Sequence, residues 1–225
     1  MIMMPGTTIE PRPLSPELIV VTAIELLEQH GEAGFSLRKL GQRLGCDPMT
    51  VLYHFKSKDG LLRAMADHLS AQLSASDPSQ SWRDRLRALA LEYRRVALAF
   101  PSSFALMARF WTTGPADYQH IELVYRALQD AGFDDQRLAE AGLGWYAAVI
   151  GLAAAEARGF LHSASHADTL EITKLPPASF ATVQRLVPAF HTLDSERSYR
   201  LMIDAVLDGL DGAARRTAQR REATP

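Results

Sequence analysis

The sequence of 225 residues has one cysteine, a formal net charge of only −2 and no long hydrophobic run. A single thiol, Cys46, cannot form an internal disulfide, which favours a reducing compartment such as the cytoplasm. The small net charge gives no overall attraction for polyanions, so binding to nucleic acid would require a local basic surface. The most apolar stretch, residues 141–155, is shorter than the roughly 20 residues that a membrane-spanning helix needs. We therefore expect no membrane partner.

The motifs of common catalytic sites are also missing. The chain has no Gly-x-Ser-x-Gly elbow, phosphate-binding loop or His-Glu-x-x-His helix, so we expect neither an enzyme nor a cofactor. His162 and His166 have the spacing that would place both rings on one side of a helix, with Asp168 close behind. The serine and alanine residues between them favour a helix end in solvent over a metal site.

Residues 35–58 have the pattern of a helix-turn-helix. Ser36 is a candidate N-cap for a first helix, and Gly45 can adopt the left-handed conformation that ends it. Asp47 can cap a second helix, with Pro48 at its first position, where a missing N–H costs nothing. A short turn of this kind lets the second helix enter the major groove of DNA.

Basic residues gather in and after this motif. Between Ser36 and Arg63 there are six lysines and arginines against two aspartates, although the whole chain is slightly acidic. We interpret this contrast as a confined surface for phosphates. A supporting helix is expected to begin at Ser15-Pro16 and to stop at His30-Gly31.

The rest of the chain predicts helices and no strand. We expect a flexible arm at residues 1–14, a DNA-binding domain at 15–76, a regulatory domain at 82–212 and a flexible tail at 213–225, with a serine-rich boundary at 74–81. Helical patterns in the regulatory domain cover 82–100, 102–111, 117–131, 134–162, 177–187 and 195–211.

The order of the N-terminal signals resembles the DNA-binding domain of TetR-family transcriptional repressors over about residues 18–66. The segments that carry the resemblance are 26–31, 35–41, Gly45 and 54–62. The pattern of residues 199–210 is similar to the end of tetracycline-repressor-like C-terminal domains. The resemblance implies an all-α fold with an N-terminal three-helix helix-turn-helix domain and a larger helical domain for ligand binding and dimerisation.

The resemblance also implies roles for individual residues. Ser36, Arg38 and Lys58 would hold phosphates, and the second helix of the motif would face the groove. The predicted DNA-binding residues are Ser36, Arg38, Asp47, Pro48, Met49, Thr50, Tyr53, His54 and Lys58. The family usually has an aromatic residue where this chain has Leu52, so Tyr53 or His54 is expected to supply that contact. Because residues 47–55 contain no Arg, Asn or Gln, we expect apolar contacts and DNA shape to contribute to specificity.

Aromatic and methionine side chains in the regulatory domain could line a pocket for an apolar or aromatic small molecule, or simply form core. The candidates are Phe104, Met107, Phe110, Trp111, Tyr125, Trp145 and Tyr146. Small residues between 141 and 160, together with Ile203, Val206, Leu207 and Leu210 in 195–211, predict a four-helix homodimer seam. The expected function is a ligand-responsive repressor acting on a palindromic DNA operator. The alternative is a ligand-independent DNA-bound scaffold or protein-interaction module.

Overall fold

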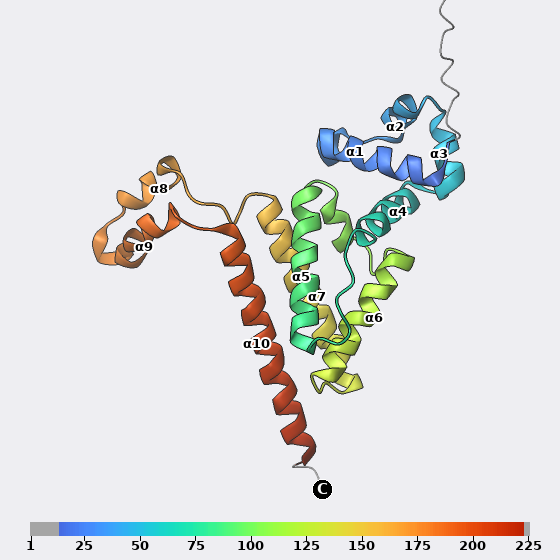
Figure 1. Cartoon of the computed structure of the whole chain (residues 1–225). Coiled ribbons are helices and arrows are strands. Elements are labelled where there is room, and N and C mark those ends of the chain that lie inside the picture. Colours follow the sequence, from blue (N-terminus) through green and yellow to red (C-terminus); the bar gives the residue numbers. More distant parts are fainter. Residues whose placement is uncertain (1–13, 223–225) are drawn as a thin grey trace, which may run out of the picture. The chain divides into compact units, whose positions relative to one another are not determined.

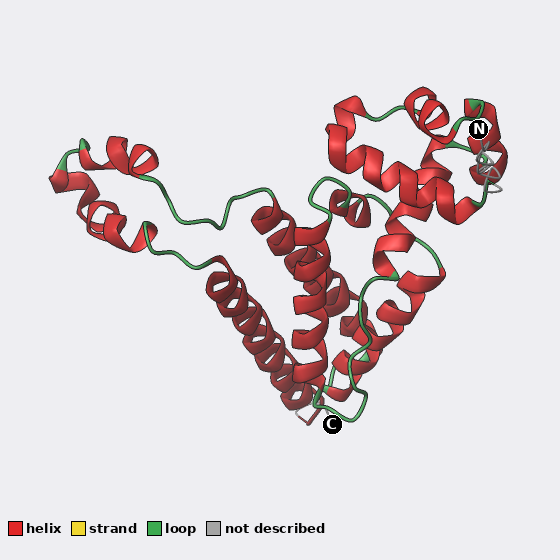
Figure 2. Ribbon diagram, turned by 45° about the horizontal axis from the view of Figure 1, so that its top comes forward, coloured by secondary structure: helices red, strands yellow, loops and turns green. Residues whose placement is uncertain are grey.

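The computed structural model describes the backbone of residues 14–222 and the side chains of residues 14–216. All regular elements in this range are helices, which confirms the predicted all-α class (Figures 1 and 2). In chain order they are α1 Pro16–Gly34, α2 Leu37–Leu44, α3 Pro48–Phe55, α4 Lys58–Ser70, α5 Trp82–Ala99, the 3-10 helix η1 Phe104–Ala108, α6 Pro115–Asp130, α7 Asp135–Ala157, α8 His166–Thr173, α9 Pro177–Phe190 and α10 Ser195–Glu222. The predicted arm at residues 1–14 lies almost wholly outside the described residues.

The chain forms two compact units that divide within α4, between Met65 and Ala66. The N-terminal unit contains α1, α2, α3 and the start of α4, and the C-terminal unit contains the remainder. The serine-rich segment at 74–81, predicted as a domain boundary, lies inside the C-terminal unit, in the loop that joins α4 to α5.

The N-terminal unit begins and turns where the sequence predicts. The Ser15 hydroxyl accepts a hydrogen bond from the backbone N–H of Leu18 at 3.1 Å, with Pro16 in the first helical position. Gly31 has φ of 64°, a left-handed value that kinks α1 where a stop was expected, and the helical segment resumes as far as Gly34. Apolar side chains of all four helices form the core of this unit: Ile19, Ala23, Leu27, Leu40, Val51 and Leu61.

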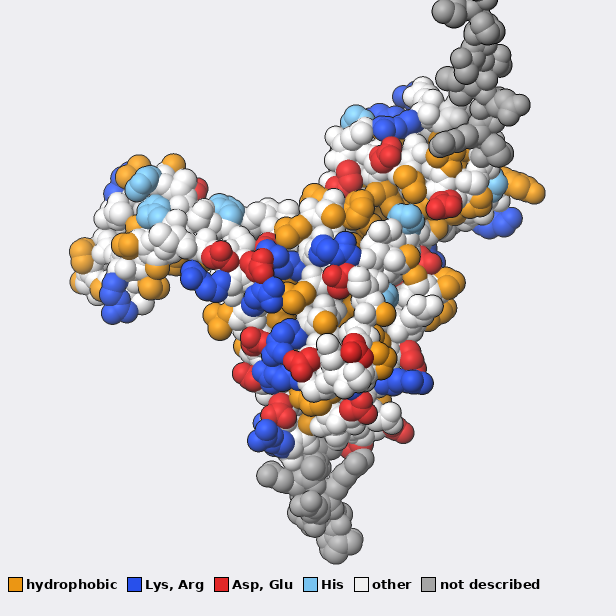
Figure 3. Space-filling view, in the orientation of Figure 1, with side chains coloured by type: hydrophobic (Ala, Val, Ile, Leu, Met, Phe, Trp, Pro, Cys, Tyr) orange, Lys and Arg blue, Asp and Glu red, His pale blue; other side chains and the backbone are white. Residues whose placement is uncertain are grey.

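The C-terminal unit is built around α5, which packs along α7, α6 and α10. The Tyr199 hydroxyl on α10 donates a hydrogen bond to the Ala90 carbonyl on α5 at 2.7 Å, deep in the core. Ion pairs reinforce the same seam, including Arg87 with Asp204 at 2.9 Å. Figure 3 shows acidic and basic side chains mixed along this face of the unit. The two helices are therefore joined by a core contact and by a row of opposite charges.

Three segments differ from the sequence-based helix assignments. The stretch 102–111 contains only the 3-10 helix η1, because Pro101 precedes it and the Gly114-Pro115 break follows closely. Helix α7 ends at Ala157 and not near residue 162, since Gly159 takes φ of 82° just beyond it. At the C-terminus, α10 continues through most of the segment predicted to be a flexible tail.

Helix α8 was not predicted at all. Only Thr169 is buried on it, so the segment lacks the apolar stripe that marks an amphipathic helix. The signal that could have located it is the capping box, in which the Ser165 hydroxyl and the Asp168 carboxylate bond to each other's backbone N–H groups. Helices α8 and α9 pack against each other, away from the bundle in both ribbon views.

Candidate DNA-binding surface and ligand cavity

The helix-turn-helix is fixed by two side-chain caps and one close backbone contact. The Ser36 hydroxyl accepts the Lys39 N–H at 3.2 Å at the start of α2, and the Asp47 carboxylate accepts the Met49 N–H at 2.7 Å at the start of α3. Between them Gly45 has φ of 67°, as its predicted role requires.

Gly41 allows the turn to lie directly on α2. A Cβ atom on Gly41 would stand 2.7 Å from the Cys46 carbonyl oxygen and 3.2 Å from the ring of Pro48. Any larger residue at this position would push α3 away from α2, so the angle between the two helices depends on this glycine.

Helix α3 has one buried face and one open face. Val51 is fully buried, whereas Met49 and Tyr53 are 67% and 76% exposed. The other residues that we predicted to bind DNA on α3, Pro48, Thr50 and His54, are half-buried, and Asp47 is exposed at the helix start. The open face is therefore apolar and aromatic. It has few side chains that could make two hydrogen bonds to one base.

Basic side chains flank this open face. Arg38 and Lys58 are exposed, and the Lys58 ammonium lies 5.9 Å from the centre of the Phe35 ring. Arg43 has a different position, because it donates to Gln29 at 2.5 Å and pairs with Glu25 at 3.1 Å. These contacts tie α2 to α1, so Arg43 is held as a structural link, while Arg38 stays open to solvent.

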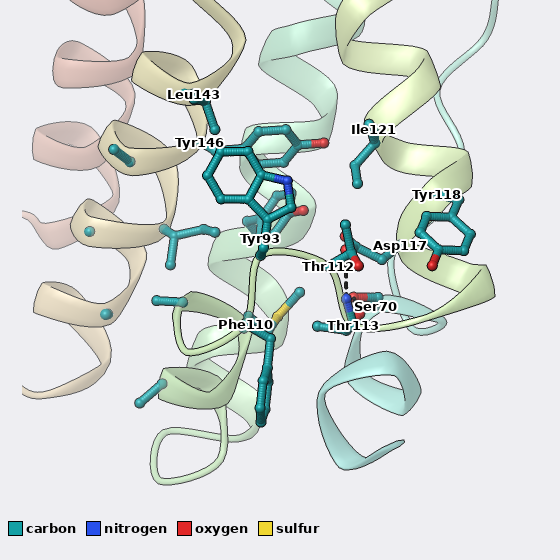
Figure 4. A pocket seen from close by; sticks show the side chains of 18 of the residues that line it. Ser70, Tyr93, Phe110, Thr112, Thr113, Asp117, Tyr118, Ile121, Leu143 and Tyr146 are labelled. Carbon is teal, nitrogen blue, oxygen red and sulfur yellow. Dashed lines mark hydrogen bonds between the residues drawn. The ribbon is translucent and has the colours of Figure 1, made fainter. Parts of the chain in front are cut away.

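The C-terminal unit contains a cavity of about 680 Å³ between η1, α6 and α7 (Figure 4). Its volume lies within the range of about 300–1,000 Å³ typical of small-molecule sites. The lining is mostly aromatic and aliphatic and includes Tyr93, Met107, Phe110, Trp111, Tyr118, Ile121, Tyr125, Leu143, Tyr146 and Ile150. Trp111 belongs to the lining although it is 83% exposed, so it stands at the mouth of the cavity.

Five of the seven aromatic and methionine residues singled out in the sequence line this cavity: Met107, Phe110, Trp111, Tyr125 and Tyr146. Phe104 and Trp145 do not. Each is 1% exposed and packs edge-to-face against Tyr93, so both belong to the core behind the cavity wall.

The cavity has one acidic end, which the sequence analysis missed. Asp117, on the first turn of α6, is 9% exposed, and one of its carboxylate oxygens accepts the Thr113 N–H at 3.0 Å. Burial raises the pKa of Asp117, and the nearby Asp67 carboxylate raises it further, while the Thr113 bond opposes both effects. Asp67, at the end of α4, itself accepts from the Ala116 N–H at 3.1 Å.

His120 stands one turn further along α6 and faces inward. One of its ring nitrogens lies 3.1 Å from the Ser70 carbonyl oxygen, and burial lowers the pKa of the imidazole. The sequence signal for this polar cluster was the spacing of Asp117 and His120, which share one face of an otherwise amphipathic helix.

The two histidines weighed as metal ligands do not share a helix face. His162 lies in the loop after α7, and His166 is the first residue of α8. Among residues 14–216, no group of three or more His, Cys, Asp or Glu side chains is placed to hold a metal ion.

Family profiles match both units. The profile for bacterial regulatory proteins of the tetR family covers residues 19–65, and the one for the tetracyclin repressor-like C-terminal domain covers residues 75–213. An HTH-type transcriptional regulator of Saccharopolyspora erythraea is 34% identical over 64% of this chain and 61% of its own length, so the chain spans less than two thirds of that relative. The class A tetracycline repressor from transposon 1721 of Escherichia coli is 26% identical over 88% of this chain and 90% of the relative.

A solved structure extends the likeness to a ligand complex. The TetR family protein ActR of Streptomyces coelicolor, in complex with actinorhodin, is 25% identical and superposes with a TM-score of 0.78 over 90% of this chain and 99% of that one. The chain therefore belongs to the TetR family of transcriptional regulators. Members of this family bind DNA operators and small-molecule ligands, usually form dimers and are typically not enzymes.

Proposed function

We propose that this TetR-family member is a cytoplasmic, ligand-responsive repressor that binds a palindromic operator as a homodimer. A small apolar or aromatic molecule would bind in the C-terminal unit and release the protein from DNA. The observation that carries the proposal is the cavity of about 680 Å³ in the regulatory unit of a chain with a basic helix-turn-helix. A DNA-bound scaffold would have no use for such a cavity.

The proposed docking places α3 in the major groove. Met49 and Tyr53 would contact base edges and thymine methyl groups, since both are exposed on the open face of α3. The exposed Arg38 and Lys58 would hold phosphates on either side, which positions the helix without specifying a sequence.

The proposed dimer uses outward faces of α7 and α10. Although α7 contacts α5, α6, α10 and η1, only 22% of its most apolar 18-residue window is buried. By length and composition this helix could cross a membrane, but a face left open for a second copy explains the same apolar content. Gly144, Ala148, Gly151 and Ala155 recur on that face, where small side chains permit close helix packing.

On α10 the seam residues differ from those named in the sequence. Ile203 and Leu207 are buried in the core of their own chain and cannot reach a partner. Leu201 and Met202, which are exposed, would take their place, with Val206 and Leu210 half-buried beside them. Two-fold symmetry would then present paired α3 helices to half-sites about 34–36 Å apart.

The test begins with operator selection from a random double-stranded DNA library, followed by affinity measurements at several salt concentrations. We expect Lys58→Ala to weaken binding to every sequence and to reduce the salt dependence by roughly one phosphate contact. Thr50→Ala should change the preferred sequence instead. Arg126→Ala, on the exposed surface of α6, is the matched control and should change neither. Unchanged affinity and preference in both variants would contradict the proposed docking.

A further inference from the structure

The ligand cavity contains one buried carboxylate, that of Asp117. Two titratable groups act on Asp117: the Asp67 carboxylate raises its pKa and the His120 imidazole lowers it. The other charged lining residue, Arg158, is exposed, so water solvates its guanidinium. A buried carboxylate of this kind is costly unless it is paired.

The polar groups of the cavity include the Asp117 carboxylate and a tyrosine hydroxyl. Oδ2 of Asp117 accepts the Thr113 N–H at 3.0 Å, and the carboxylate lines the cavity. The Tyr146 hydroxyl is buried and has no hydrogen-bond partner in residues 14–216. Both groups belong to the lining of the same cavity (Figure 4). The interior therefore retains an acceptor and a hydroxyl that a ligand can satisfy.

The walls beside this acidic end are aromatic. Tyr93 is 1% exposed and forms part of the lining, as do Tyr118 and Tyr125 of α6. Aromatic faces attract cations through their quadrupoles, and an ammonium group has both the charge and the N–H donors that a carboxylate needs. A neutral or anionic head group would leave the carboxylate unpaired or repel it.

We propose that the effector is a planar aromatic molecule with a protonated amine, and that Asp117 binds the amine while the aromatic walls hold the rings. This inference rests on the proposed function, because it names the chemical class of the ligand for the same cavity. Asp117 would distinguish charged from neutral effectors. The apolar lining would supply most of the remaining affinity.

Three probes with the same ring system and different charge test the inference. They are 9-(aminomethyl)anthracene, which is protonated at neutral pH, 9-anthracenemethanol and anthracene-9-carboxylate. Dissociation constants are measured on the full chain by fluorescence quenching and confirmed by calorimetry. We expect the amine to bind at least roughly tenfold more tightly than the alcohol, and the carboxylate to bind most weakly.

Variants then locate the source of that preference. Asp117→Asn keeps an oxygen that can accept the Thr113 N–H, so this hydrogen bond is retained. It should weaken amine binding by roughly tenfold and change alcohol binding by less than about twofold. Glu122→Gln makes the same chemical change on the exposed surface of α6 and should affect no probe. Urea unfolding and operator binding verify that both variants are folded.

The outcomes separate the two proposals. If all three probes bind equally, or if Asp117→Asn weakens the alcohol as much as the amine, the cationic effector is overturned while the aromatic cavity stands. If the carboxylate binds most tightly, the assignment of Asp117 is also overturned. If no probe binds, both the apolar or aromatic effector of the proposed function and this inference are overturned.

Discussion

The two units of the chain share side-chain helix caps but differ in the sequence separation of their other contacts. In the N-terminal unit each helix start from α1 to α3 is capped by a side chain two or three residues before the N–H group that it binds. Helices α5, α7 and α8 of the C-terminal unit have caps of the same kind. In the C-terminal unit the decisive contacts join residues far apart in sequence, such as Tyr199 with Ala90 and Arg94 with Glu156. The comparison shows that the DNA-binding surface follows from local chemistry, whereas the ligand cavity requires the whole helical assembly.

Ion pairs illustrate the same contrast. Arg43 and Glu25 meet at 3.1 Å on the surface of the N-terminal unit, where water screens their attraction. Arg94 makes two bonds of 2.7 Å to the Glu156 carboxylate, which is 5% exposed between α5, α7 and α10. The hydrogen bonds to the Glu156 carboxylate raise the pKa of Arg94, so the guanidinium keeps its positive charge.

The largest expected effect comes from breaking the buried pair. Glu156→Ala leaves the Arg94 guanidinium partly buried without its main partner, and we expect a loss of about 3 kcal/mol in the free energy of unfolding. The matched surface change, Glu25→Ala, should cost less than about 1 kcal/mol. Urea denaturation followed by circular dichroism measures both. Equal losses would remove the distinction between the two units.

A smaller effect is expected from the cap of the recognition helix. Asp47→Ala removes the acceptor for the Met49 N–H and should lower stability by about 1 kcal/mol, with weaker operator binding because α3 starts less firmly. Asp47→Ser supplies another good cap and should restore most of the stability. If serine behaved like alanine, the cap would not be the stabilising element of α3.

The smallest effect is a pH dependence that originates in the C-terminal unit. Burial keeps the pKa of His120 below its ordinary value of about 6.5, so as pH falls through that value the unfolded chain gains a proton that the folded chain resists. This residue therefore makes the protein less stable with falling pH.

Removal of the imidazole should flatten this dependence. Asp117 has a raised pKa, and its protonation favours the folded chain, which gives a slope of opposite sign. The substitution His120→Gln is therefore made in a chain that already carries Asp117→Asn. The free energies of unfolding of the single and the double variant are measured in urea at pH 7.5 and 5.5. Identical pH slopes in the two proteins would contradict the assignment to His120.

Much of the N-terminal unit could be predicted because each signal acts within a few residues. Ser36, Gly45 and Asp47 take the conformations and hydrogen bonds that their types and spacing favour. The partner of Arg43 could not be foreseen, since Glu25 and Gln29 lie on another helix and reach it only after the three helices pack.

In the C-terminal unit, sequence patterns predicted the positions of most helices, but they did not predict which side chains line the cavity and which fill the core. Aromatic residues at helical spacing are equally consistent with a core and with a pocket wall, and only packing separates Tyr146 from its neighbour Trp145. The same applies to Ile203 and Leu207, which we expected at a dimer seam and which fill their own core. Periodicity gives the apolar face of a helix but not the partner that covers it.

The sequence by itself determined the all-α class, the helix-turn-helix with its caps, and the concentration of basic charge around it, because these depend on residue type and short spacing. Only the tertiary structure decided which aromatic side chains surround a cavity and that Asp117 stands at its acidic end. A cavity is the space that several helices leave unfilled, and no single segment specifies that space.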